Sequence, residues 1–168
     1  MEKKPLFLAL FIGLLIASTA IGQQRFDEKL RSMYRQTVAL IHPDDLARLL
    51  ESDRAPVLLD TRSLDEFEVS HLHDARFVDY QSFDKKRVED LDRNTPVVVY
   101  CSVGYRSERI GEKLLAMGFK DVKNLYGGIF EWVNESHPVE NSRGTPTDSV
   151  HTYNKEWSRW LIRGIKVY

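Results

Sequence analysis

Cys101 is the only cysteine in the 168-residue chain, and its surroundings favour a reactive thiol. The apolar run 96–100, Pro-Val-Val-Val-Tyr, predicts a buried strand, and the pattern over 108–117 predicts a helix. Cys101 would then lie where a strand ends, a glycine-containing loop turns and a helix begins. Loop N–H groups and a helix N-terminus favour a thiolate. We interpret Cys101 as a nucleophile; the alternative is a small buried hydrophobic residue, the commoner role of a lone cysteine.

The length of the loop narrows this chemistry. Four residues separate Cys101 from Arg106, which gives the spacing Cys-x4-Arg. The corresponding loop of cysteine phosphatases and arsenate reductases is one residue longer and wraps a tetrahedral oxyanion. A shorter loop makes a tighter cradle, which suits one sulfur atom carried on the cysteine better than a phosphate.

Three stretches of the sequence resemble one known family. Residues 101–107, Cys-Ser-Val-Gly-Tyr-Arg-Ser, resemble the Cys-x-x-Gly-x-Arg-Ser active loop of rhodanese-type sulfurtransferases. Residues 59–72 resemble the family's Asp-x-Arg-x-x-x-Glu-Phe and Gly-His-Ile motif, and residues 125–132 resemble its Leu-x-Gly-Gly-x-x-x-Trp motif. The three motifs occur in the family's order and spacing and together cover about residues 41–135.

The resemblance implies a role for each motif residue. Cys101 would become a persulfide, and Arg106 would hold the loop or an anionic donor. The rest of the loop would bind substrate and persulfide, with Ser107 also capping the following helix: Ser102, Val103, Gly104, Tyr105 and Ser107. The supporting residues would be Asp60, Arg62, Glu66 and His71. We expect Asp60 and Glu66 to pair with loop arginines, because a buried arginine needs a carboxylate.

The sequence also departs from the family pattern. Ser70 replaces the glycine of the Gly-His-Ile motif, and His73-Asp74 replace a following Pro-Gly. Ser102 and Val103 are uncharged, whereas some rhodaneses carry basic residues there to hold thiosulfate. We therefore expect less charged persulfide or polysulfide donors to be used better than thiosulfate.

Two other classes of function are weighed against this interpretation. A cysteine hydrolase would need a general base beside Cys101, and the candidates are His71 and His73, with Asp74 next to the latter. A non-enzymatic rhodanese-like module that binds a partner or senses oxidants is the second alternative. A metal site is not expected, because the five histidines offer one His-x-His pair and no second cluster.

The first 22 residues predict export. A short basic start at Lys3 and Lys4 precedes the apolar run 6–16, and small residues follow up to Gly22. This is the pattern of a signal peptide cleaved ahead of Gln23. A transmembrane anchor is the alternative, but the run is shorter than the roughly 20 residues that a span needs. The expected location is periplasmic or secreted.

Charge limits the expected partners. The formal net charge is −1, with 24 basic and 25 acidic residues, so nothing favours nucleic acid or, after cleavage, a membrane surface. The expected partners are a small sulfur donor and a thiol or cyanide acceptor, and a thiol-carrying protein is a further candidate. The proposed chemistry requires no cofactor.

The elements that must position the loop alternate along the chain. Strands are expected at 56–60, 76–79, 97–100 and 122–125, with helices at 43–50, 63–69, 107–117 and 128–134. Gly118 is the expected stop of the third helix. This alternation predicts an α/β fold with a mostly parallel sheet flanked by helices on both faces. Cys101 would lie at the carboxyl end of a strand, where such sheets bind ligands.

The domain organisation follows from these elements. Residues 23–40 are expected to form an extension, either helical over 25–40 or only loosely docked. Residues 41–136 are expected to form a single rhodanese-like domain. Residues 137–150 are expected to be loop, followed by an aromatic helix over 152–166 with Trp157, Trp160 and Leu161 on one face. That helix would dock on its own domain or present an aromatic face to a partner.

Overall fold

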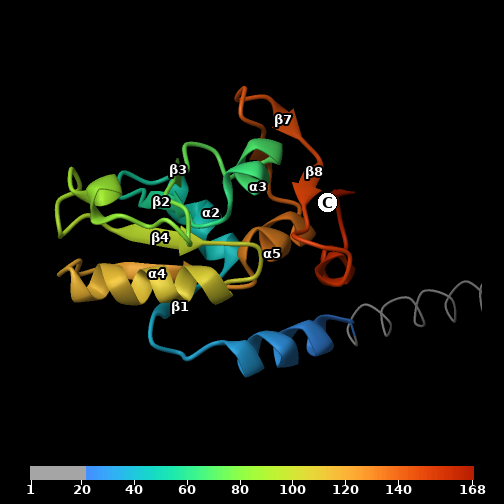
Figure 1. Ribbon diagram of the computed structural model, residues 1–168, viewed down its shortest axis with the longest axis horizontal. Coiled ribbons are helices and arrows are strands. Elements are labelled where there is room, and N and C mark those ends of the chain that lie inside the picture. Colours follow the sequence, from blue (N-terminus) through green and yellow to red (C-terminus); the bar gives the residue numbers. More distant parts are fainter. Residues whose placement is uncertain (1–21) are drawn as a thin grey trace, which may run out of the picture. The chain divides into compact units, whose positions relative to one another are not determined.

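The structure is a computed structural model that describes residues 22–168 (Figure 1). The predicted signal peptide therefore lies almost wholly outside the described residues. The chain divides into two units after Met33. In the first unit, residues 22–33 form a helix in which side chains four positions apart are hydrogen-bonded, as Gln23 is to Asp27. None of the helices in the described range 22–168 has both the length and the apolar character that crossing a bilayer requires.

The second unit is built on a sheet of five parallel strands in the order β1-β5-β4-β2-β3. In sheet order the strands are β1 (Ala39–Ile41), β5 (Val122–Leu125), β4 (Val97–Tyr100), β2 (Val57–Asp60) and β3 (Arg76–Phe77). The α/β fold predicted from the alternating pattern is confirmed. The central strand β4 pairs on both sides, so Cys101 follows the middle of the sheet.

The helix expected over 25–40 is wrong in its second half. The helix ends at residue 33, and β1 begins at Ala39 and pairs with β5. Val38 falls within the range of the predicted helix, but it lies outside any helix and is buried in the hydrophobic core cluster. The partner strand lies far along the chain, so local periodicity does not reveal the pairing. The sheet thus begins two residues before the predicted domain boundary at 41.

Helices cover the sheet: α2 (Pro43–Leu50), α3 (Leu64–Val69), α4 (Tyr105–Ala116) and α5 (Gly128–Asn134), with a short 3-10 helix η1 (Lys85–Val88). Helix α3 begins with a capping box, in which Ser63 and Glu66 each bond the other's backbone N–H. Helix α4 is followed by Gly118 at φ +94°, as the predicted helix stop requires.

The core follows from the alternation of side chains along β4. Val97 and Val99 belong to a cluster with Ile110 and Leu114 of α4, which packs across β4 and β5. Because successive strand side chains point to opposite faces, Val98 faces the other side of the sheet, and it is buried too. The strand that leads into Cys101 is therefore buried on both faces.

The C-terminal segment differs from its prediction. Residues 137–151, expected to be loop, contain three short strands: β6 (Val139–Glu140), β7 (Pro146–Thr147) and β8 (Ser149–His151). In place of the helix expected over 152–166, the described structure has the 3-10 helix η2 (Trp157–Trp160) and the strand β9 (Ile165–Val167). Strands β8 and β9 pair in parallel, so the chain between them must turn back. The aromatic spacing therefore reflects a short turn of 3-10 helix.

Candidate active site

Cys101 lies directly after β4, in the loop that leads into α4 (Figure 1). Its side chain is 1% exposed, and the backbone N–H of Gly104 donates a hydrogen bond to its Sγ at 3.1 Å. Gly104 is at φ +92°, a conformation that residues with a Cβ rarely adopt. Helix α4 starts at the next residue and points its N-terminus at the loop, where negative charge is stabilised. The predicted strand–cysteine–loop–helix arrangement is confirmed.

The Gly-Gly motif before α5 fixes the loop from one side. The N–H groups of Ile129 and Phe130 donate to the carbonyl oxygens of Cys101 and Ser102 at 2.9 and 3.1 Å. Gly128 has φ +58°, and a Cβ built there would lie 2.2 Å from the Cys101 carbonyl oxygen. The close approach of the two backbones therefore requires a glycine.

Tyr34 fixes the loop from another direction, and the sequence analysis did not identify it. Its hydroxyl donates to the Val103 carbonyl at 2.6 Å and accepts from the Gly127 N–H at 3.1 Å. Burial raises the pKa of Tyr34, so the phenol stays protonated and remains a donor. A Cβ at Gly104 would lie 2.1 Å from the Tyr34 hydroxyl, a second reason for the glycine. No local pattern around residue 34 signals this contact.

Arg106 and Glu66 form the ion pair that was expected for the loop. The two guanidinium nitrogens of Arg106 reach the two carboxylate oxygens of Glu66 at 2.7 Å each. Ser102 completes the group, since its hydroxyl donates to Glu66 and accepts from Arg106, both at 2.9 Å. Although burial acts to raise it, the bonds from Arg106 hold the pKa of Glu66 at about 2. The pair ties the loop to α3.

Arg106 also lies beside the thiol. Burial acts to lower the pKa of Arg106, but the Glu66 carboxylate and the neighbouring Cys101 raise it above its ordinary value. The guanidinium therefore places a positive charge next to the sulfur. Because Glu66 balances its charge, Arg106 offers an anionic donor less attraction than a free guanidinium would.

The other acidic residue of the motif has a different partner from the one expected. Asp60 pairs with Arg62, two positions away, at 2.6 Å, and both side chains are fully buried. Arg62 also donates to the Ser70 carbonyl, and its guanidinium lies 5.8 Å from the Tyr100 ring. Glu66 therefore pairs with the loop arginine Arg106, whereas Asp60 and Arg62 pair with each other and hold the turn after β2.

His71 packs within its own motif. Its ring stacks on Phe67 at 3.9 Å, its Nδ1 contacts the Phe67 carbonyl at 2.9 Å, and its Nε2 faces Glu140 at 3.7 Å. Both ring nitrogens are therefore turned toward groups other than Cys101. The exposed His73 pairs with Glu140 at 2.8 Å. This geometry does not supply the general base that a cysteine hydrolase needs.

The remaining loop residues are placed as follows. Ser107 was expected to cap α4 and to bond the persulfide, but the helix begins at Tyr105 with Gly104 as its cap. The buried Ser107 hydroxyl instead donates to Asn124 at 2.7 Å. Asn124, a residue that the sequence analysis missed, donates in turn to the Gly104 carbonyl at 3.0 Å. Tyr105 is 42% exposed.

Ser102 and Val103 are buried, each with 5% of its side chain exposed. Ser102 joins the Glu66–Arg106 pair, and Val103 contributes its carbonyl to Tyr34. Both residues therefore shape the loop from within. A basic residue at either position would have to be accommodated inside the loop.

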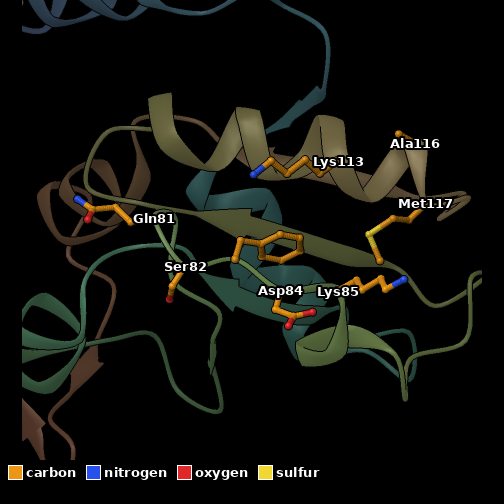
Figure 2. A pocket seen from close by; sticks show the side chains of 8 residues that line it. Gln81, Ser82, Asp84, Lys85, Lys113, Ala116 and Met117 are labelled. Carbon is orange, nitrogen blue, oxygen red and sulfur yellow. The ribbon is translucent and has the colours of Figure 1, made fainter.

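Two further features lie away from Cys101. A shallow depression is lined by residues between β3 and η1 and by the C-terminal end of α4, including Phe83, Lys113 and Met117 (Figure 2). Lys113 lies over the Phe83 ring at 5.5 Å. The loop is at the other end of α4, about 18 Å along a helix of this length. The depression is therefore separate from the candidate active site.

The second feature is a group of ligand atoms after α5. Asp44, Glu135 and His137 bring one atom each within 4.8 Å of one another. His137 contacts Asp44 at 3.0 Å, and its ring lies tilted against that of Trp132, with the centroids 4.4 Å apart. Asp44 and Glu135 are exposed and His137 is half-buried, and exposed acidic groups of this kind are not by themselves a metal site.

Comparison with known proteins agrees with this geometry. The family model described as "Rhodanese-like domain" matches residues 42–135. The thiosulfate sulfurtransferase GlpE of Coxiella burnetii is 31% identical over 93 residues, which cover 55% of this chain and 85% of the relative. The tRNA uridine(34) hydroxylase of Chlamydia muridarum is 31% identical over 99 residues, which cover 55% of this chain and 30% of that longer protein.

Solved structures show the same fold. A rhodanese-like domain protein from Staphylococcus aureus aligns with a TM-score of 0.55 at 23% identity, over 62% of this chain and 98% of its own. A thiosulfate sulfurtransferase from Pseudomonas aeruginosa aligns with a TM-score of 0.58 at 22% identity, over 76% of this chain and 23% of its own. With the Cys101 loop, its Gly-Gly brace and its Arg106–Glu66 pair in place, the chain belongs to the rhodanese-like domain family.

Proposed function

We propose that this protein is an exported sulfurtransferase that moves a sulfane sulfur from a donor to a thiol or cyanide through a Cys101 persulfide. Relatives named as sulfurtransferases support sulfur transfer as the general chemistry. The observation that carries the proposal is the hydrogen bond from the Gly104 N–H to the Cys101 Sγ, in a loop that ends at the N-terminus of α4. Arg106 adds a positive charge beside the sulfur.

The first step is attack of the Cys101 thiolate on the outer sulfur of the donor. A new S–S bond forms, the S–S bond of the donor breaks, and the leaving group departs with the electron pair: sulfite from thiosulfate, or a thiolate from a persulfide. The negative charge then rests on the outer sulfur of the persulfide. Loop N–H groups and the helix N-terminus stabilise it there.

The second step returns the enzyme to its starting state. A thiolate or cyanide attacks the outer sulfur of the persulfide, and the S–S bond breaks with its electron pair passing to Cys101. The products are a persulfide or thiocyanate and the free Cys101 thiolate. Because the donor's remainder leaves before the acceptor reacts, ping-pong kinetics are expected.

The charges around the loop favour weakly charged donors. Glu66 balances the charge of Arg106, and Ser102 and Val103 are neutral and buried. Attraction for the thiosulfate dianion would therefore come mainly from backbone N–H groups. We expect a high KM for thiosulfate and better use of persulfide or polysulfide donors, with a thiol-carrying protein as a further partner.

Export is proposed from the sequence of residues 1–22. N-terminal sequencing of the protein recovered from its native cell envelope or medium should give a start near Gln23. A start at Met1 or Glu2 would contradict the proposal.

Intact-mass spectrometry of the protein after incubation with each donor tests the chemistry. The wild type should gain the mass of one sulfur atom and lose it when cyanide or a thiol is added. Cys101→Ser should gain nothing and should lack turnover, because a hydroxyl is a far poorer nucleophile near neutral pH. Its thermal unfolding should match that of the wild type. If the wild type binds no sulfur from any donor, a binding or oxidant-sensing module is the better interpretation.

A further inference from the structure

The C-terminal segment brings an aromatic side chain to the Cys101 loop. Tyr153 lies between β8 and β9, outside the residues matched by the family model. Its ring centroid is 5.5 Å from the guanidinium carbon of Arg106, the residue beside the thiol. Figure 1 shows this segment in red at the end of the domain where β4 meets α4, and β8 packs against α3.

The backbone holds Tyr153 in an unusual conformation. Its φ is +64°, which is costly for a residue with a Cβ and persists only where neighbouring contacts impose it. Those contacts surround it: its N–H donates to the His151 ring at 3.1 Å, the N–H of the buried Thr152 donates to Val167 at 2.8 Å, and the N–H of Asn154 donates to Thr152 at 2.7 Å. Tyr153 is nevertheless 58% exposed, so this conformation does not serve to bury the ring.

Because the charges at the loop are balanced, the exposed ring of Tyr153 is the main feature near the loop that a substrate would contact. Cys101 is 1% exposed, and Glu66 balances Arg106. Tyr153 and Tyr105 are both exposed, and Arg109 covers part of the Tyr105 ring at 4.8 Å. A ring face suits a carbon-bearing group better than an inorganic anion.

We infer that Tyr153 is a specificity-determining residue that packs against the carbon-bearing part of an organic sulfur donor as it reaches Cys101. The inference rests on the proposed sulfurtransferase function and narrows its substrate class. It assigns the recognition of the organic group to the ring, and not to the hydroxyl.

Three donors that react in the same way test the inference: benzenethiosulfonate, methanethiosulfonate and thiosulfate. In each case the outer sulfur passes to Cys101 and a sulfinate or sulfite leaves. Tyr153→Ala should lower kcat/KM for benzenethiosulfonate by about two- to tenfold, the range of one aromatic contact, through KM and not kcat. The two small donors should change much less, and Tyr153→Phe should behave as the wild type with all three.

Other outcomes would overturn the inference. An equal loss with all three donors would assign Tyr153 a structural role, and a gain for the largest donor would show that the ring only obstructs the entrance. A loss in Tyr153→Phe equal to that in Tyr153→Ala would assign the effect to the hydroxyl.

A second measurement does not depend on sulfur transfer. Cys101 is the only thiol, so its alkylation can be followed by mass spectrometry. The ratio of the rates with N-phenylmaleimide and N-methylmaleimide should fall in Tyr153→Ala and stay constant in Tyr153→Phe. An unchanged or higher ratio would contradict the role of the ring. A wild type that alkylates with this selectivity but forms no persulfide would overturn the proposed function and leave the role of Tyr153 standing.

Discussion

Two carboxylates of one short motif each pair with an arginine, and the two pairs differ in their surroundings. Asp60 and Arg62 pair at 2.6 Å with both side chains fully buried. Glu66, from the same motif, pairs with Arg106 of the Cys101 loop at 2.7 Å, with 2% and 19% of the side chains exposed. The first pair joins residues two positions apart, and the second joins residues 40 positions apart.

The two pairs therefore have different roles, one in stability and one at the reacting sulfur. The Asp60–Arg62 pair has no access to a substrate, so its role is to hold the turn after β2, where Arg62 also bonds the Ser70 carbonyl. The Glu66–Arg106 pair connects α3 to the loop and lies beside the sulfur. We therefore expect changes in the first pair to act mainly on stability and changes in the second mainly on turnover.

Breaking the buried pair should have the largest effect on stability. Arg62→Met leaves the Asp60 carboxylate buried without its partner, and such changes typically cost about 3–5 kcal/mol. The free energy of unfolding from urea titration measures the loss. The matched control is Arg62→Met combined with Asp60→Asn, which removes both charges and should recover part of the stability. A single variant as stable as the wild type would contradict the structural role.

Arg106→Lys should mainly affect turnover. Lysine keeps the charge but cannot make the two parallel bonds to Glu66, so the loop loses its fixed geometry. We expect kcat/KM for sulfur transfer to fall by about 10- to 100-fold, as small misplacements at a reacting centre do. The urea midpoint should move less than in Arg62→Met. Full activity in the lysine variant would show that charge alone is needed at this position.

Tyr34→Phe tests two uncharged hydrogen bonds that hold the loop. The change removes the donor to the Val103 carbonyl and the acceptor for the Gly127 N–H. Leaving such groups unsatisfied costs about 1–3 kcal/mol, so a modest loss of stability and a several-fold loss of kcat are expected. Tyr34→Leu serves as the comparison, because it also removes the ring. A phenylalanine variant with unchanged kcat would mean that the loop is positioned without the Tyr34 hydroxyl.

The pH dependence of stability that comes from Glu66 is the smallest expected effect, and it is absent near neutral pH. The pKa of Glu66 is about 2 in the folded protein against an ordinary value of 4.5, so the unfolded chain binds the proton more readily. The contribution of this pair to stability is complete above about pH 4.5 and is lost as the pH falls toward 2. Stability curves of the wild type and Glu66→Gln should therefore converge in acid. Parallel curves over this range would contradict the low pKa.

Much of the fold and the centre of the site follow from the sequence. Strand–helix alternation and the three motifs predict the sheet, the loop, and the pairing of Glu66 with Arg106. The pairing of β1 with β5 was missed because β1 is three residues long and its partner is distant. Tyr34, Asn124 and Tyr153 were missed for the same reason: each acts on the loop through contacts that no local spacing encodes. The C-terminal aromatic residues have helical spacing, but the pairing of β8 with β9 prevents a helix there.

The connection made by Tyr34 also bears on how the protein folds. Tyr34 and Gly127 are separated by 93 positions, and β1 must wait for β5 before it can pair. Contacts between such distant parts of a chain form slowly, because a long loop must close first. During synthesis Tyr34 and β1 leave the ribosome well before Gly127 and β5 do. Cys101 therefore acquires its fixed loop late in folding, after most of the sheet can already exist.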